Sequence, residues 1–106
     1  MKRLFLVIIL AACSQGSSSS SITLGAAGPW KEIYGQMNRR GMELAEEEIN
    51  ALPERKDHPL RIRYVDDEGS GEKASRVAQT FVDSTDVLAV IGHVNSGAMV
   101  SAAQAP

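Results

Sequence analysis

The sequence predicts an α/β fold, in which an open, doubly wound sheet of parallel strands carries helices on both faces. Three segments typical of strands alternate with segments whose apolar residues recur at helical spacing, in the order β-α-β-α-β-α. The third run, residues 87–92, consists of apolar residues and a closing glycine. A strand that is apolar on both sides is expected in the middle of a parallel sheet, covered by helices.

The N-terminal residues have the order of an export signal. A short basic start, Met1-Lys2-Arg3, precedes an unbroken apolar run over residues 4–10 and two alanines before Cys13. The cysteine at this place resembles the lipobox of bacterial lipoproteins, in which the thiol is acylated and the chain is cut just before it. We therefore expect a lipoprotein signal peptide over residues 1–12 and lipidation at Cys13. The alternative is a short N-terminal strand or helix with a buried cysteine.

Residues 13–21 follow as the lipidated cysteine and a serine-rich linker, whose composition predicts a flexible tether. The formal net charge of the whole chain is -2, and no basic run suggests contact with nucleic acid. No apolar stretch of about 20 residues predicts a spanning helix. The folded part is expected to be residues 22–106.

The first half of the folded part is predicted to hold two strands and a helix. Residues 22–27 read as a strand closed by the turn Gly28-Pro29, and Pro53 stops the helix that follows. The strand at residues 60–65 alternates apolar and charged residues, which favours a place near the edge of the sheet, and a polar turn over residues 66–71 ends it. The helix is expected to present one apolar face made of Met37, Gly41, Leu44, Ala45, Ile49 and Leu52.

The second half continues with a clearer helix. Its apolar residues fall at the spacing of one helical face, and they are Ala74, Val77, Ala78, Phe81 and Val82. The apolar strand at residues 87–92 comes next, and small residues from Ser96 to Ala105 predict a third helix.

This architecture predicts where a ligand binds. In open α/β sheets the site lies beyond the carboxyl ends of the strands, which selects the loops at residues 28–34, 66–71 and 93–97. Asn95-Ser96-Gly97 leads from the third strand into a helix. Ser96 can cap that helix, or its hydroxyl and the neighbouring N–H groups can hold an anion such as a carboxylate. Spacing alone favours the cap.

Several short motifs, in register, resemble the leucine/isoleucine/valine-binding proteins, which are type 1 periplasmic binding proteins of branched-chain amino acid ABC importers. The similarity spans residues 22–106, behind a lipobox and a serine linker. The motifs are Gly28-Pro29, residues 34–36, 41–45 and 47–51, Tyr64-Val65-Asp66-Asp67, residues 90–93, and Ser96-Gly97.

The resemblance implies that this chain is the first half of the N-terminal lobe of a two-lobe protein, with the ligand held between the lobes. By position, Ser96 would bind the α-carboxylate of an amino acid through its hydroxyl and N–H. Gly97 would let the backbone approach closely. Tyr34 would wall the ligand's side chain, its alternative being a packing residue at a helix start, and Val94 and Asn95 would flank the carboxylate loop. Trp30 is a further candidate without a matching family contact.

The chain departs from the family pattern in one place. Some relatives have a disulfide between the loops after the second and third strands, where this chain has Gly69 and Asn95. Asn95 makes the rim of the pocket more polar, which weakens the expectation of a strict preference for leucine, isoleucine or valine. The family's ammonium-binding residues and second lobe would lie beyond Pro106, so we expect an incomplete gene product that binds ligand poorly alone.

No catalytic constellation, metal site or cofactor is expected. Glu46-Glu47-Glu48 is read as a solvated helix face, and residues 66–68 are read as a polar turn, with a cation site as the alternative. His58 and His93 lie far apart in the sequence, and the single cysteine does not join them as a likely zinc ligand. The glycines after the first strand lack dinucleotide-binding spacing. The chain is therefore not expected to be an enzyme.

The predicted function is capture of a branched-chain or related amino acid, or a similar small carboxylate or amide, outside the cytoplasm. The expected partners are the solute, the permease subunits of an ABC importer and the membrane, reached through the lipid anchor. The expected location is the periplasm or the cell surface. The alternative is the ligand-binding ectodomain of a sensor with the same fold, which the lipobox disfavours because receptors usually continue into a spanning helix.

Overall fold

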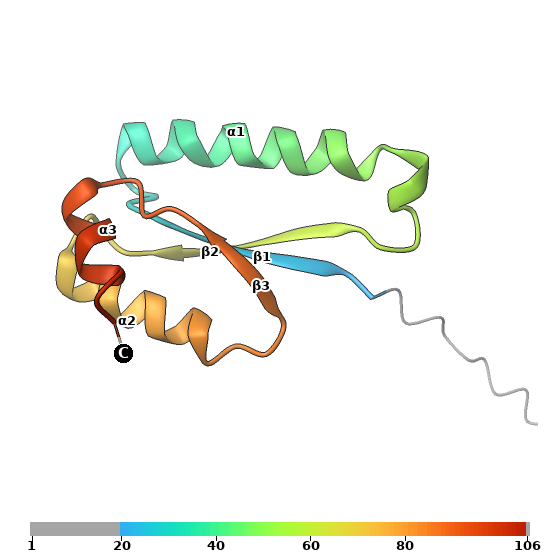
Figure 1. Cartoon of the computed structure of the whole chain (residues 1–106). Helices are drawn as coiled ribbons and strands as arrows, with labels where there is room; N and C mark the ends of the chain where they lie inside the picture. The colour runs from blue at the N-terminus through green and yellow to red at the C-terminus, as the bar shows by residue number, and fades with distance from the viewer. Residues whose placement is uncertain (1–19, 106) are drawn as a thin grey trace, which may run out of the picture.

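The computed structural model describes residues 20–105, so the predicted signal peptide, the lipidation site Cys13 and most of the linker lie outside the described residues. The predicted alternation of strands and helices is confirmed (Figure 1). The elements are β1 (Ile22–Gly28), α1 (Ile33–Asn50), the 3-10 turn η1 (Pro53–Arg55), β2 (Leu60–Asp66), α2 (Gly71–Val82), β3 (Val87–Ile91) and α3 (Ser96–Ala102).

The three strands form one parallel sheet in the order β2-β1-β3. The register between β1 and β2 is regular, and it pairs Ile22 with Leu60 and Gly28 with Asp66. Between β1 and β3 the register shifts once, near Thr23 and Leu24. The central strand is thus the one closest to the N-terminus, and its alanines Ala26 and Ala27 are fully buried.

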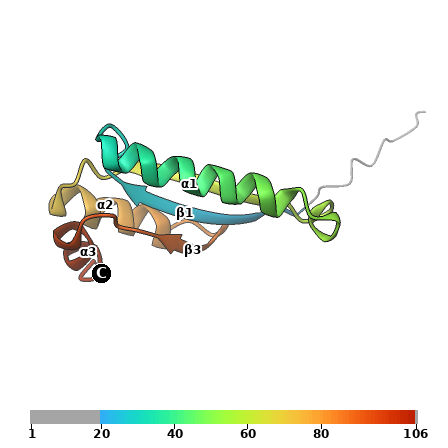
Figure 2. The ribbon, with the colours of Figure 1, turned by 90° about the horizontal axis from the view of Figure 1, so that it is seen from above.

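Helices cover both faces of this sheet. In Figure 1 the long helix α1 lies on one side, and α2 and α3 lie together on the other; the view from above in Figure 2 shows α1 running along β1. This is the predicted doubly wound arrangement. The buried apolar residues are Ala26, Ala27, Trp30, Ala74, Val77, Phe81 and Ala98.

The third strand does not lie where its apolar pattern predicts. Residues 87–92 were expected in the middle of the sheet, but β3 is an edge strand of the described chain, and Leu88 is 76% exposed. The expectation is wrong because an apolar pattern indicates only that both faces of a strand tend to be buried. It does not say whether the strand has a neighbour on each side, and within the described chain β3 pairs only with β1. The edge position expected for residues 60–65 is confirmed, since β2 forms the other edge.

The apolar face predicted for helix α1 is largely wrong. Ile49 is partly buried, but Met37 and Leu44 are exposed, and the buried Gly35 lies against the backbone of Pro29. The helix carries apolar residues on two sides, and periodicity alone does not say which of them meets the sheet. Its end is fastened by Asn50, whose side-chain amide donates to the carbonyl of Leu60 at 2.9 Å and whose Oδ1 accepts from the Leu60 N–H at 2.7 Å.

Helix α2 follows the predicted face closely. Ala74, Val77 and Phe81 are buried, but Val82 is 71% exposed, so its predicted burial is wrong. The helix begins after Ser70, whose hydroxyl accepts a hydrogen bond from the Lys73 N–H at 3.4 Å as an N-cap. Among residues 20–105, no helix is both long and apolar enough to cross a membrane.

Candidate functional site

The carboxyl ends of the three strands meet at one edge of the sheet. Gly28, the last residue of β1, pairs with Asp66, the last residue of β2, and Ala26 pairs with Ile91 at the end of β3. Parallel pairing therefore sends all three following loops out at the same edge, as the sequence predicts. Side-chain and backbone contacts then join the loops to one another.

Trp30 ties the first loop to the second strand. Its indole N–H donates to the carbonyl of Val65 at 2.8 Å, and its ring meets Tyr64 edge-on with centroids 5.6 Å apart. The ring is buried, and its own backbone N–H donates to Asp66 Oδ1 at 3.3 Å. These contacts hold the first loop against β2. They give no support to the prediction that Trp30 contacts a ligand.

Charged residues line a polar hollow of about 180 Å³ between the first and second loops. Lys31 Nζ lies 3.8 Å from Asp66 and 3.9 Å from Glu68, and Glu68 also pairs with Lys73. The hydrogen bond from Lys73 and then its charge hold the pKa of the Glu68 carboxyl below its usual value, against an opposing effect of desolvation and with a lesser contribution from the charge of Lys31. With Glu32 also in the lining, the carboxylates outnumber Lys31. This hollow therefore repels a carboxylate ligand.

A buried hydrogen bond joins the second and third loops. His93 Nδ1 lies 2.6 Å from Asp67 Oδ2, and the two side chains are 3% and 0% exposed. The other oxygen of Asp67 accepts from the N–H of Gly69 at 2.8 Å, and the Asp67 N–H donates to the carbonyl of Gly28 at 3.1 Å. Asp67 thus makes hydrogen bonds to the end of β1, within the second loop and to the third loop.

Close backbone approach fixes the start of the third loop. Gly92 has φ +116, and a Cβ atom there would collide with the carbonyl of Ala27 on β1, so this position requires glycine. Two residues on, Val94 packs over Gly28, where an added Cβ atom would lie 2.7 Å from Val94 Cγ2. The loop that follows β3 is therefore pressed against the end of the central strand.

The structure brings together two of the residues predicted for the site, Tyr34 and Asn95. The Tyr34 hydroxyl lies 3.1 Å from Asn95 Nδ2 and 3.3 Å from Asn95 Oδ1. Gly69 stands beside them in the left-handed region, with φ +67, and a Cβ atom there would lie 3.4 Å from Asn95 Nδ2. The two positions that correspond to a disulfide in some relatives are thus adjacent here as well.

Ser96 and Gly97 are exposed at the start of α3. Ser96 is the first helical residue, and the N-cap position belongs to Asn95, whose side chain makes no capping hydrogen bond. The alternative of Ser96 as a plain N-cap is therefore wrong. A Cβ atom at Gly97 would meet no other part of the described chain within 4 Å, so its backbone is open to approach.

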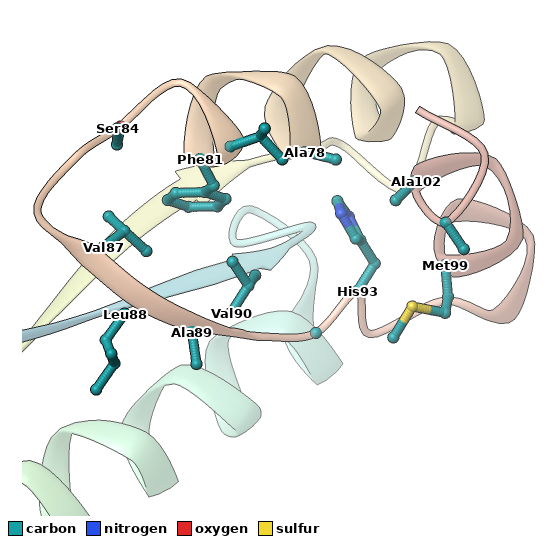
Figure 3. Close-up of a pocket in the computed structure, with 13 residues that line it drawn as sticks. Ala78, Phe81, Ser84, Val87, Leu88, Ala89, Val90, His93, Met99 and Ala102 are labelled. Carbon is teal, nitrogen blue, oxygen red and sulfur yellow. The ribbon is translucent and has the colours of Figure 1, made fainter. Parts of the chain in front are cut away.

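A larger apolar groove of about 380 Å³ runs along the free side of β3 (Figure 3). Phe81, Leu88 and Met99 contribute to its lining, together with the ring of His93. The groove follows the strand and its neighbouring helices, and its lining includes His93 but neither Ser96 nor Gly97. It offers few polar groups for a carboxylate, so we place the candidate ligand site at the loops.

Among residues 20–105, no group of three or more His, Cys, Asp or Glu side chains is arranged to hold a metal ion. The hydroxyl of Ser96 and the exposed N–H groups beside it are hydrogen-bond donors, and they suit an anion. Tyr34 and Val94 add apolar surface, and the amide of Asn95 adds a donor and an acceptor. The sequence predicts that these groups bind a small molecule through its carboxylate, and this assignment stays a prediction.

The sequence places Asp67 and His93 in two of the site loops but does not predict that they contact each other. Asp67 was read as one residue of a polar turn, and His93 was weighed as a zinc ligand. A signal is present, since Asp67 follows β2 and His93 lies two residues beyond the end of β3, and parallel strands end at a common edge. Pairing of the two would follow if β2 and β3 were known to flank one strand, which the sequence does not state.

No family model matches the chain. It is 32% identical over 104 residues to the Leu/Ile/Val-binding protein homolog 2 of Brucella abortus, covering 93% of this chain and 28% of that protein. It is also 28% identical over 88 residues to an amino acid binding protein of Pseudomonas aeruginosa, with 80% and 24% covered.

Two solved structures of an ABC transporter substrate-binding protein from Desulfitobacterium hafniense have the same fold. One matches with a TM-score of 0.69 and 35% identity; the other, a complex with Leu, matches with 0.68 and 36%. Both matches cover 78% of this chain and 24% of the solved chain. The chain therefore spans about a quarter of the length of the relatives it matches.

These relatives confirm the predicted resemblance to the leucine/isoleucine/valine-binding proteins. They confirm the α/β fold as that of ABC transporter substrate-binding proteins. They also agree with the expectation that the chain is not an enzyme, because they are named as amino acid binding or substrate-binding proteins.

Proposed function

We propose that this chain forms part of the solute-binding component of an ABC importer, which captures an amino acid outside the cytoplasm. The observation that carries the proposal is the exposed Ser96-Gly97 step at the carboxyl end of the sheet, in a chain similar to amino acid binding proteins. The site offers hydrogen-bond donors, the Ser96 hydroxyl among them, that suit a carboxylate.

The α-carboxylate of the amino acid binds at Ser96 and Gly97. The Ser96 hydroxyl and the N–H groups at the start of α3 donate to it, and each such charge-assisted hydrogen bond is worth about 1.5–3 kcal/mol. Gly97 has no side chain to hold the ligand away, and the space beside it is open. The neighbouring polar hollow is excluded as the carboxylate site because Asp66 and Glu68 would repel a second negative charge.

The side chain of the amino acid lies against Tyr34. This ring is 45% exposed and is held by its hydroxyl to Asn95, which leaves its face available for apolar contact. Val94 and Asn95 flank the loop, and the Asn95 amide makes this rim polar. The ligand class is accordingly a branched-chain or related amino acid, or a similar small carboxylate or amide, without strict limitation to leucine, isoleucine and valine.

In the complete binding protein a second lobe supplies the opposite wall and the groups that bind the ammonium. Closure of two lobes around the solute is a hinge motion that ligand contacts on both sides stabilise. The loaded protein then delivers the solute to the permease subunits of the importer. Support for this step is the similarity to ABC transporter substrate-binding proteins, one of which is a complex with Leu.

The protein is exported and held at the membrane by lipid on Cys13, in the periplasm or at the cell surface. Residues 1–12 act as the signal peptide, and each buried acyl CH₂ stabilises the anchor by about 0.8 kcal/mol. Metabolic labelling with palmitate tests this step. The wild-type chain is expected to label and Cys13→Ala to remain unlabelled, whereas equal labelling of both would refute the anchor.

Uptake of radiolabelled L-leucine by cells tests the importer role. Deletion of the gene is expected to lower uptake at limiting leucine, and the wild-type gene is expected to restore it while Ser96→Ala restores less. Unchanged uptake in the deletion strain would contradict the proposal. If the deletion instead abolished a transcriptional response to leucine, the sensor alternative would be favoured.

A further inference from the structure

We propose that Asp67 and His93 are positioning residues, which hold the loop of residues 94–97 in the geometry that receives the ligand's carboxylate. The proposal rests on the proposed function, because it concerns how that site is kept in place. Neither residue is placed in contact with the ligand. Both act through the loop that carries Ser96.

The pair is anchored firmly on the Asp67 side. Both carboxylate oxygens are engaged, one by His93 at 2.6 Å and one by the N–H of Gly69 at 2.8 Å. The backbone is held too, since the Asp67 N–H donates to the carbonyl of Gly28 and the Asp67 carbonyl accepts from Ser70. Through these hydrogen bonds, Asp67 fixes the position of the His93 imidazole relative to the central strand and the second loop.

His93 stands three positions before Ser96 in the chain, so its orientation sets the path of the loop. With the Asp67 carboxylate as the acceptor, the donor in this hydrogen bond is His93 Nδ1. The hydrogen bond to Asp67 fixes the orientation of the His93 imidazole ring. On either side of it, Gly92 is pressed against Ala27, and Val94 packs over Gly28.

Stability alone does not account for a buried polar pair at this place. Replacement of such a pair by apolar residues of similar volume is often neutral or stabilising, because the desolvation of the charged groups is avoided. A directional hydrogen bond, in contrast, fixes orientation as well as proximity. The loop beyond the pair carries the exposed Ser96 and Gly97, whose donors must point to one place to bind a carboxylate.

The test compares three variants of the chain by NMR, with L-leucine as the probe and the backbone amide signals of residues 94–97 as the readout. His93→Leu removes the hydrogen bond. His93→Asn keeps an N–H donor near the position of Nδ1 and serves as the conservative rescue. Val77→Ala is the control, because Val77 is a buried core residue outside the loops and its truncation lowers stability without removing the pair.

Leucine affinity is expected to fall by about tenfold in His93→Leu, the scale of one charge-assisted hydrogen bond. His93→Asn is expected to recover most of it, and Val77→Ala to keep wild-type affinity while unfolding at a lower temperature. The proposal is overturned if His93→Leu stays folded and binds leucine normally. It is also overturned if the loss of leucine affinity is proportional to the loss of melting temperature in all variants, Val77→Ala included. Should His93→Leu not fold, the imidazole nitrogen signals of the wild type decide. They are expected to shift with leucine alongside the Ser96 and Gly97 amides, and unmoved ring signals overturn the proposal.

Failure of the proposed function gives a different result from failure of this inference. If leucine moves no signal of the wild-type loop, amino acid capture by this site is refuted. The positioning role is then judged without ligand by amide hydrogen exchange of residues 94–97. Faster exchange in His93→Leu than in Val77→Ala supports it, and equal exchange overturns it.

Discussion

The hydroxyl of Tyr34 lies 3.1 Å from Nδ2 of Asn95, which joins the first turn of α1 to the loop after β3. The contact connects the residue assigned to the ligand's side chain with a residue beside the carboxylate loop. The Tyr34 hydroxyl is thus satisfied within the protein, and the residue is 45% exposed. The same bond leaves hydrogen-bonding capacity on the Asn95 amide.

Truncation of Tyr34 is expected to discriminate between large and small ligands. Tyr34→Ala should weaken L-leucine binding by about 1–2 kcal/mol, because apolar contact with the ring is lost, and should leave glycine almost unaffected. NMR titrations with both amino acids measure the difference. Tyr34→Phe is the matched control, since it keeps the ring and loses only the bond to Asn95. An equal loss for leucine and glycine would assign Tyr34 a packing role.

Removal of the Ser96 hydroxyl is expected to weaken every ligand that carries a carboxylate. The loss for Ser96→Ala should be about 1–3 kcal/mol, the range of one hydrogen bond to a charged group. Ser84→Ala is the control, because the Ser84 hydroxyl bonds the carbonyl of Thr80 at 2.8 Å, beyond the C-terminal end of α2. If both variants bind L-leucine as tightly as the wild type, Ser96 is not a ligand contact.

A disulfide is expected to form between the second and third loops when Gly69 and Asn95 are both replaced by cysteine. The two positions are close enough, since a Cβ atom at Gly69 would lie 3.8 Å from Asn95 Cγ. In a Cys13→Ser background, the oxidised double variant should exceed its own reduced form in unfolding free energy by about 2–4 kcal/mol. Both redox forms carry the same cysteine at position 69, so the strain of a non-glycine residue at φ +67 cancels in the comparison.

Thiol titration and thermal unfolding measure that prediction. Free thiols that persist under oxidising conditions would show that the loops are farther apart than described. The single variants Gly69→Cys and Asn95→Cys, each with one thiol, control for the effect of the substitutions themselves.

Tyr64 is expected to make the fold sensitive to alkaline pH. Burial of its hydroxyl, then the carboxylates of Glu43 and Glu46, raise the pKa of Tyr64 above 10.0, while Arg39 opposes them. The unfolded chain ionises first as pH rises, so the stabilisation is fully present below about pH 10 and is lost through the raised folded pKa. Denaturant unfolding of the wild type and Tyr64→Phe across that range should show a steeper loss in the wild type.

At neutral pH, Tyr64→Phe should not destabilise the protein. The Tyr64 hydroxyl is buried and has no hydrogen-bond partner among residues 20–105, so its removal relieves a cost of about 1 kcal/mol or more. The ring contacts with Trp30 and Arg39 remain. A loss of stability in this variant at neutral pH would show that the hydroxyl is bonded after all.

The order of elements could be predicted because strands and helices are coded locally. The alternation of Leu60 to Val65 and the helical spacing of Ala74, Val77 and Phe81 each describe one element, and the structure has both. The site loops followed from the rule that parallel strands end together. Sequence motifs added Ser96, Gly97 and Tyr34 through resemblance, and their roles remain predictions.

The relations between elements could not be predicted in the same way. The apolar residues of β3 do not reveal that β3 lies at an edge of the described sheet. Its position depends on which other strands pair with it, and those strands lie elsewhere in the sequence. Helix α1 has apolar residues on two sides, and only packing against the sheet decides that Ile49 faces inward and Leu44 outward. The Asp67–His93 pair likewise depends on which strands flank β1.

A pair of leucine analogues tests the central claim, that the Ser96-Gly97 loop binds a carboxylate. 4-Methylpentanoate keeps the carboxylate and lacks the ammonium, and isopentylamine keeps the ammonium and lacks the carboxylate. In NMR titrations at millimolar concentration, where a Kd of about 1 mM corresponds to about −4.1 kcal/mol, 4-methylpentanoate is expected to shift the amide signals of Ser96 and Gly97 and isopentylamine to leave them in place. Equal shifts with both analogues, or shifts with isopentylamine alone, would contradict the account.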